Sequence, residues 1–141
     1  PFAIHLQQAA PAIFRGRPGS GLEGFATIVR AVNNEVVTWS NPVHPGDDLT
    51  IYLTGLGRTS PEIPAGYPGT IPPASAVLTP SVLIGERSAS VIFAGLAPRE
   101  VGVYQINVKA PWNVPTGWQV PLTIIQGGYQ TTVAVRVVTN N

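Results

Sequence analysis

Gly102-Val-Tyr-Gln-Ile-Asn-Val-Lys109 alternates apolar and polar residues at a period of two. In an extended chain successive side chains point to opposite faces, so apolar members share one side and polar members the other. One face would carry Tyr104, Ile106 and Val108, and the other Gln105, Asn107 and Lys109. This pattern predicts a half-buried strand of an antiparallel sheet.

The rest of the chain follows the same plan in short runs. Fifteen glycines and fifteen prolines interrupt the 141 residues, and no window keeps the 3.6-residue period of an amphipathic helix. The chain is therefore predicted to be all-β. We expect strands over residues 2–7, 26–32, 35–39, 48–54, 81–84, 90–93, 103–109, 119–125 and 130–138.

Two short segments predict tight hairpins. Val32-Asn33-Asn34-Glu35 places two asparagines between apolar runs, and asparagine tolerates the left-handed backbone that two-residue turns require. Ile125-Gln126-Gly127-Gly128-Tyr129 follows the same logic with glycine. Each segment should join two neighbouring antiparallel strands.

A Gly-x-Tyr opening to a late strand is typical of immunoglobulin-like sandwiches, where a corner tyrosine bonds back to upstream backbone. Together with the short strands, it predicts an all-β, immunoglobulin-like antiparallel two-sheet sandwich with Greek-key connections. The expected core residues are Leu49, Ile51, Leu53, Phe93, Tyr104, Ile106, Val108, Leu122, Ile124, Val133 and Val135.

The segment from Gly57 to Pro80 is rich in proline and shows little alternation. A long loop of this kind is either functional or an ordered excursion over the surface, and its prolines indicate a stiff loop. We favour a crossover between the two sheets over a binding loop, because Greek-key sandwiches need such a connection.

Composition limits the classes of function. Charged residues make up 11% of the chain and the net charge is +1, against roughly 25% charged residues in an average soluble protein. With no basic run, nucleic acid is not an expected partner, and no run of apolar residues is long enough to embed the chain in a membrane. The sparsely charged surface favours an extracellular or cell-surface protein.

Four segments stand in order over roughly residues 9 to 138: Ala10-Pro-Ala-Ile-Phe14, Pro45-Gly46-Asp-Asp-Leu-Thr-Ile-Tyr-Leu-Thr-Gly-Leu-Gly57, Val91-Ile-Phe-Ala-Gly-Leu-Ala-Pro98 and Gly102-Val-Tyr-Gln-Ile-Asn-Val108. Together they resemble a family of uncharacterised bacterial C-terminal domains of large secreted proteins. The resemblance implies an immunoglobulin-like β-sandwich on an exported protein, and it implies no catalytic residue.

No combination of residues predicts a catalytic centre or a cofactor. The sequence has no cysteine and only two histidines, His5 and His44, at a spacing that fits no metal-ligand motif. Asp47, Asp48 and Glu62 could supply oxygens to calcium, but Pro-Gly-Asp-Asp before a strand is ordinary turn chemistry. We therefore predict that the protein is not an enzyme and binds no obligatory metal.

Three aromatic residues are candidates for stacking on sugars. Trp112 and Trp118 flank an expected loop, and Tyr67 lies in the proline-rich segment. Exposed rings at such positions could form a glycan platform. The alternative, which we favour, is that the tryptophans cap the open end of the core.

The first eight residues are treated as a separate unit, followed by the sandwich domain at residues 9–141. Phe2, Ile4 and Leu6 alternate with Ala3, His5 and Gln7, and the chain then reaches Pro11. Such a terminal strand can pair within its own domain or enter a groove in a neighbouring copy.

Two functions from different classes therefore remain open. The favoured one is a noncatalytic structural subunit of an extracellular filament or surface layer, a homo-oligomer or homopolymer joined through exchange of the N-terminal strand. The alternative is a carbohydrate-binding or adhesive module that uses the loop aromatics.

Overall fold

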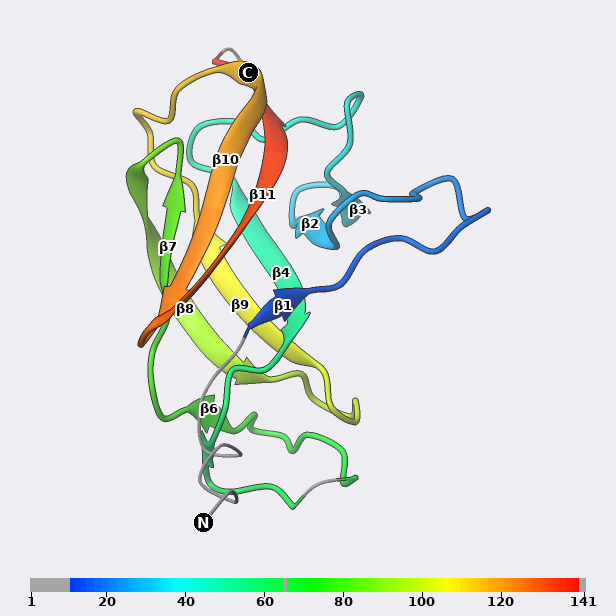
Figure 1. The fold of residues 1–141 in the computed structure, drawn as a ribbon, viewed down its shortest axis with the longest axis vertical. Coiled ribbons are helices and arrows are strands. Elements are labelled where there is room, and N and C mark those ends of the chain that lie inside the picture. The colour runs from blue at the N-terminus through cyan, green and yellow to red at the C-terminus, as the bar shows by residue number, and fades with distance from the viewer. Residues whose placement is uncertain (1–10, 65, 140–141) are drawn as a thin grey trace.

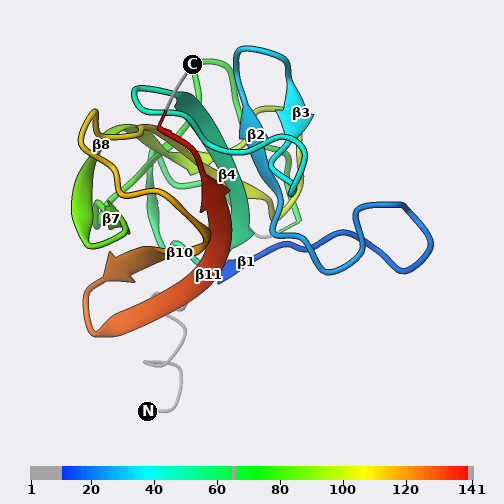
Figure 2. The same cartoon turned by 90° about the horizontal axis from the view of Figure 1, so that it is seen from above.

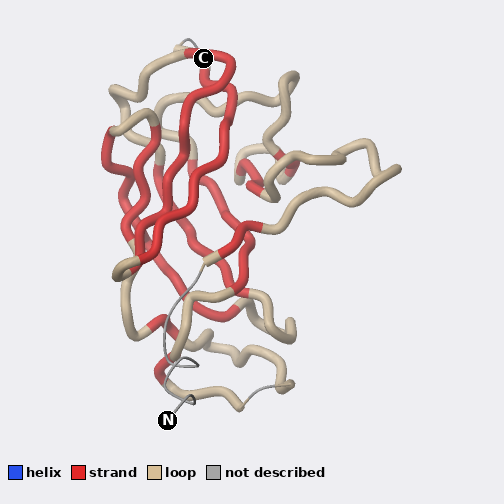
Figure 3. The backbone as a smooth tube through the Cα atoms, viewed as in Figure 1, coloured by secondary structure: helices blue, strands red, loops and turns tan. Residues whose placement is uncertain are grey.

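Eleven strands and no helix make up residues 11–64 and 66–139, the parts that the computed structural model describes (Figures 1 and 3). The all-β prediction is therefore confirmed for this part of the chain. No helix within it is long and apolar enough to cross a membrane. The strands are β1 (Ala12–Ile13), β2 (Ile28–Arg30), β3 (Glu35–Val36), β4 (Asp48–Thr54), β5 (Thr59–Ser60), β6 (Ser75–Ala76), β7 (Ser81–Ile84), β8 (Arg87–Leu96), β9 (Tyr104–Lys109), β10 (Gly117–Gln126) and β11 (Tyr129–Val137).

The strands form one curled antiparallel sheet in the order β11-β10-β7-β8-β9-β4-β2-β3. β1 pairs with β4, and β6 pairs with both β5 and β8. The curl brings the end of β11 to the segment before β4, where Val43 and Val137 form a parallel bridge. This arrangement is consistent with a β-sandwich, while the immunoglobulin-like topology stays a prediction.

A continuous apolar core fills the interior of the curled sheet. It contains nine of the eleven residues expected there: Leu49, Ile51, Leu53, Ile106, Val108, Leu122, Ile124, Val133 and Val135. Tyr104 is partly buried and packs against this core. The strict alternation read from β4 and β9 thus identifies the buried face correctly.

Phe93 is the exception, because it is only half-buried. In the pairing of β8 with β9, Val91 lies opposite Val108 and Phe93 lies opposite Asn107, so Ile92 is an extra residue. A β-bulge of this kind reverses which side chains point inward. The expectation that Phe93 belongs to the core was wrong because the sequence pattern does not reveal the bulge.

The two hairpins have different outcomes. Gln126 pairs with Tyr129, and Gly127 has a φ of 59°, so the second prediction is confirmed. In the first hairpin Arg30 pairs with Glu35, which makes the loop four residues long, from 31 to 34. The two-residue turn was wrong, although Asn34 does adopt a left-handed φ of 58°.

Several boundaries also differ from the sequence-based ranges. β4 and β7 have the expected ends, whereas β2 and β3 are much shorter than predicted and β8 is longer at both ends. β1, β5 and β6 were not predicted, since two residues carry no periodicity. The expected strand at residues 2–7, and the division after residue 8, lie outside the described residues.

The proline-rich segment connects β4 to β7, two strands that β9 and β8 separate in the sheet. It is therefore a crossover past two strands of the curled sheet, while the expected passage between two separate sheets stays a prediction. The amide nitrogen of buried Gln126 donates to the carbonyl oxygens of Leu56, at 2.9 Å, and Leu78, at 2.6 Å. The β10–β11 hairpin thus holds both ends of the crossover.

Candidate functional site

The structure places the candidate aromatic residues in two separate regions. Tyr67, Trp112 and Trp118 have exposed fractions of 63%, 75% and 61%. Tyr67 belongs to the crossover at one end of the sheet, whereas Trp112 and Trp118 lie on or beside the β9–β10 connection at the other end (Figure 1). The three rings are exposed, but they do not form a single platform. Phe2, Ile4 and Leu6 lie outside the described residues.

Trp118 instead joins a cluster whose other members the sequence did not indicate. Its ring centroid lies 6.5 Å from that of Trp39, and Trp39 meets Phe25 edge-on at 5.3 Å. The guanidinium carbon of Arg136 stands 3.8 Å above the Trp118 ring, and the side chain also donates to the Trp39 carbonyl. We call Phe25, Trp39, Trp118 and Arg136 the aromatic row. Cation–π stacking fixes Trp118 in orientation while its ring stays accessible.

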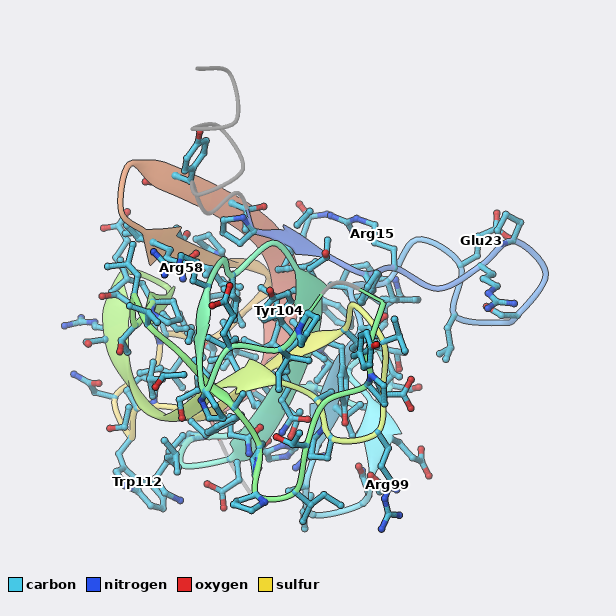
Figure 4. The ribbon with its side chains drawn as sticks, turned by 90° about the horizontal axis from the view of Figure 1, so that it is seen from below. Arg15, Glu23, Arg58, Arg99, Tyr104 and Trp112 are labelled. Atoms are coloured by element: carbon cyan, nitrogen blue, oxygen red, sulfur yellow. The ribbon has the colours of Figure 1, made fainter. Side chains whose placement is uncertain are left out.

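Trp112 has a different environment, on the side of the molecule away from the segment that carries Glu23 (Figure 4). Its ring lies directly on the backbone of Gly46, where a Cβ atom would stand 2.4 Å from the ring. Gly46 also has a φ of 76°, so glycine is required there on two grounds. Trp112 is therefore a single exposed ring seated on a turn.

A groove of about 660 Å³ runs beside β11. We call residues 15–25 the arm. One wall comes from Arg15 and residues 23–25 of the arm, together with Ala26 and Trp39. The opposite side comes from Thr132, Val133 and Ala134 of β11 and from Gln119 and Pro121 of β10. A separate crevice of only about 10 Å³ lies beside Val37 and Val135. The groove therefore lies over the middle of β11 and the facing part of β10.

The arm exists because the chain leaves the sheet between two strands that share one edge. β1 and β2 both pair with β4, at Leu53–Thr54 and at Leu49–Ile51 respectively, and the arm projects between them (Figure 1). At its base Gly16 approaches Leu22 so closely that a Cβ atom would lie 2.0 Å from the Leu22 oxygen. Arg15 donates to the Gly24 carbonyl at 2.8 Å. These contacts hold the arm beside the groove.

β11 has an open edge on the side that faces this groove. Val43 donates to the Arg136 carbonyl at 2.9 Å, and Val138 donates to the Val43 carbonyl at 3.0 Å. The Arg136 carbonyl and the Val138 amide therefore point away from β10. Main-chain groups alternate in direction along a strand. The groups of Gln130, Thr132 and Ala134 consequently point away from β10 as well, and no strand of the described residues pairs with them. Figure 2 shows this edge of β11 facing β1 and the base of the arm.

The polar groups near the groove do not form a catalytic arrangement. Glu23 accepts a hydrogen bond from the backbone nitrogen of Gly19 at 3.1 Å, and Arg15 is engaged with Gly24. His44 lies elsewhere, with Nδ1 at 3.0 Å from the Pro42 carbonyl. Within residues 11–64 and 66–139, no three metal-ligating side chains converge. That the protein is not an enzyme stays a prediction.

The aspartates of the Pro-Gly-Asp-Asp turn are engaged in ion pairs. Asp47 accepts two hydrogen bonds from Arg30, at 2.7 and 3.2 Å, and one from the backbone nitrogen of His44 at 2.8 Å. Asp48 pairs with Lys109 at 2.9 Å. The Asp47 carboxylate therefore stabilises the turn, and the Asp48 carboxylate pairs with Lys109 on the neighbouring strand. Both contacts are ordinary turn chemistry.

No protein-family model, curated protein or solved structure matches the chain. The resemblance of the four segments to bacterial C-terminal domains therefore stays a prediction.

Proposed function

We propose that the protein is a noncatalytic structural subunit of an extracellular filament or surface layer, assembled through exchange of its N-terminal strand. The observation that supports this proposal best is the open edge of β11 beside the groove. An unpaired strand edge is a ready template for another strand, and soluble proteins normally cover or charge such edges. Here the edge residues are Gln130, Thr132 and Ala134, which carry no charge.

The sequence supplies a strand suited to such an edge. In an extended strand over residues 2–7, Phe2, Ile4 and Leu6 would share one face. Burial of each of these side chains in a partner would contribute about 1.5 to 3 kcal/mol, besides the ladder hydrogen bonds. Exchange from head to tail forms an open fibre unless the rotation between copies closes a ring. A polymer stabilised in this way needs neither disulfides nor a metal.

Deletion of residues 1–8 tests the proposal. The full chain should form filaments or sheets visible by electron microscopy, and the deletion variant should remain a soluble monomer by sedimentation. A matched pair of triple substitutions removes one face of the strand at a time. Replacing Phe2, Ile4 and Leu6 by serine should abolish assembly, whereas replacing Ala3, His5 and Gln7 by serine should preserve it. Assembly of the deletion variant would contradict strand exchange.

A second candidate is a carbohydrate-binding or adhesive module. The observation that favours it is the exposed Trp118 ring, which Arg136 holds in a fixed orientation beside Trp39. Preorganised aromatic faces of this kind suit the apolar faces of sugar rings. Trp118→Ala should then reduce binding to insoluble polysaccharides at least tenfold. Trp112→Ala, which removes an equally exposed ring outside the row, serves as the control, and equal losses would argue against a site at Trp118.

A further inference from the structure

We infer that the groove along β11 of one copy is the acceptor for residues 2–7 of a second copy. This inference rests on the strand exchange proposed above and adds the surface that receives the strand. The occupant is a second copy of this chain, and three features select it: the direction of the free main-chain groups, the apolar inner face of β11 and the closed end.

The first feature is the match between the open edge and an extended segment. Gln130, Thr132 and Ala134 present main-chain groups at every second residue, with no partner among the described residues. A strand lying beside them forms the ladder bonds that the edge lacks. Residues 2–7 span roughly 20 Å when extended, which is enough to cover the free positions from 130 to 134.

The second feature is the alternation of side chains along the groove. Val133 and Val135 are buried core residues on the inner face of β11, so this face of the strand continues the core. A strand added at the open edge has one face toward the core side of the sheet and the other toward solvent. Phe2, Ile4 and Leu6 supply an apolar face at the same two-residue spacing, while His5 and Gln7 supply a polar one. Phe25 and Trp39 form an aromatic rim over the inserted strand.

The third feature is the end of the groove. Val43 occupies the edge of β11 through its bonds with Arg136 and Val138. The free part of the edge therefore stops at Ala134, and an incoming strand cannot extend further along β11. A closed end of this kind fixes the register of an exchanged strand, which an open edge alone would leave free to slip.

The direction of the chain favours a second copy over the chain's own N-terminus. Ala12 pairs with Thr54 at the end of β4, so the chain enters β1 from beyond Thr54. Ala26 lies in the other direction, because it forms a bridge with Arg15, which follows β1. Residues 2–7 would have to reverse within residues 8–11 to fill the groove of their own chain. Insertion into a neighbouring copy requires no reversal.

A proline on the open edge tests the acceptor. Ala134→Pro removes a main-chain donor that points away from β10, so the hydrogen bonds between β10 and β11 stay intact. Ala134→Val adds similar bulk and keeps the donor. We expect Ala134→Pro to abolish assembly and Ala134→Val to retain it, with both variants keeping the β-sheet circular dichroism of the natural chain. Assembly of a folded Ala134→Pro variant would overturn the inference.

Cysteine cross-linking provides a test that does not depend on a proline variant. The chain has no cysteine, so one copy can carry His5→Cys and a second, differently tagged copy Thr132→Cys or Ala134→Cys. Cross-strand neighbours lie within the Cα separation that a disulfide needs. Oxidation should link the two tags, whereas Thr123→Cys on β10 should give no product.

The outcomes separate this inference from the function on which it rests. If deletion of residues 1–8 abolishes assembly but neither edge position cross-links, strand exchange holds and the β11 acceptor is wrong. A link only within one chain, in a variant carrying both cysteines, would show that the groove holds its own N-terminus. If the full chain does not assemble at all, the proposed function itself fails.

Discussion

The hydroxyl of Tyr104 donates a hydrogen bond of 2.7 Å to the carbonyl oxygen of Gly57. This contact joins the start of β9 to the start of the crossover, 47 residues upstream. The Gly-x-Tyr sequence predicted that this tyrosine bonds to upstream backbone, and it does. The acceptor lies on the β4–β5 connection, whereas the corner contact of immunoglobulin-like domains lies a few residues before the strand, so that topology stays a prediction. Because Leu56, the preceding residue, is held by Gln126, two neighbouring carbonyl groups anchor the proline-rich segment to the core.

Tyr104→Phe should lower the free energy of unfolding by about 1 to 3 kcal/mol, because it leaves the Gly57 carbonyl without its donor while keeping the ring. The measurement is urea denaturation followed by tryptophan fluorescence. Tyr52→Phe on β4 makes the same chemical change in a half-buried side chain. It should cost less than about 0.5 kcal/mol. Equal losses in the two variants would mean that the hydrogen bond from Tyr104 to Gly57 adds no measurable stability.

Tyr104 should also make the protein sensitive to alkali. Burial raises the pKa of the Tyr104 hydroxyl above its usual value, so the folded protein retains a proton that the unfolded chain releases near pH 10. The stabilisation is therefore complete below about pH 10 and is lost as the pH rises through the folded pKa. Urea midpoints from pH 8 to 12 should fall more steeply for the natural chain than for Tyr104→Phe. Parallel curves would exclude this role.

Ile106→Ala should cost about 2 to 5 kcal/mol, because Ile106 is fully buried on β9 between β4 and β8 and its truncation leaves a cavity. The control is Ile92→Ala at the bulge of β8, where the side chain is 63% exposed. That change should alter stability by less than about 0.5 kcal/mol. Thermal or urea unfolding of the two variants decides whether the inner face of the sheet has been assigned correctly.

Gln126→Ala should be more damaging than an average polar truncation. It removes the donor from the Leu56 carbonyl, whose bond is buried, and from the Leu78 carbonyl, whose bond is partly buried. A buried acceptor left unpaired costs about 1 to 3 kcal/mol. Gln119→Ala on the same strand changes an exposed side chain and should be nearly neutral. We expect limited proteolysis to cut the crossover of the Gln126 variant first. Unchanged cleavage there would show that the crossover does not depend on this anchor.

The alternation of apolar and polar residues predicted burial best where a strand is regular and covered on one face. β4 and β9 pair in register over six residues, from Asp48 opposite Lys109 to Leu53 opposite Tyr104, so their period-two pattern reports burial directly. The bulge at Ile92 adds one residue and inverts the pattern beyond it. Short strands such as β1 form because they pair with β4. A segment of two residues is too short to show a period-two pattern in the sequence.

The candidate site was less predictable, because tertiary contacts assemble it. The sequence identified Trp118 as a candidate, but its neighbours Trp39 and Phe25 are distant from it in sequence. Nothing in the local sequence of Trp39 or Phe25 indicates that they meet Trp118. The open edge of β11 could not be read from residues 130–138 either. It depends on which strand lies beside β11, and this follows from the curl of the whole sheet.

Asp47 and Asp48 are adjacent and chemically alike, but their ion pairs should contribute unequally to the stability of the fold. Arg30 and Asp47 form an ion pair in which both side chains are only 11% exposed, whereas Lys109 and Asp48 are 42% and 55% exposed. Asp47→Asn should therefore destabilise by about 3 kcal/mol, since it leaves the Arg30 guanidinium poorly solvated and without its anion. Asp48→Asn should cost at most about 1 kcal/mol, because water screens an exposed pair.

The same pair of variants tests the calcium alternative. With its carboxylate bonded to Arg30 and to the His44 backbone nitrogen, Asp47 has little capacity left for a cation. Millimolar calcium should accordingly leave the midpoint of thermal unfolding unchanged in the natural chain and in both variants. A rise in midpoint that Asp47→Asn or Asp48→Asn removes would instead show that the turn is a calcium site, and the ion pairs would then describe only its metal-free form.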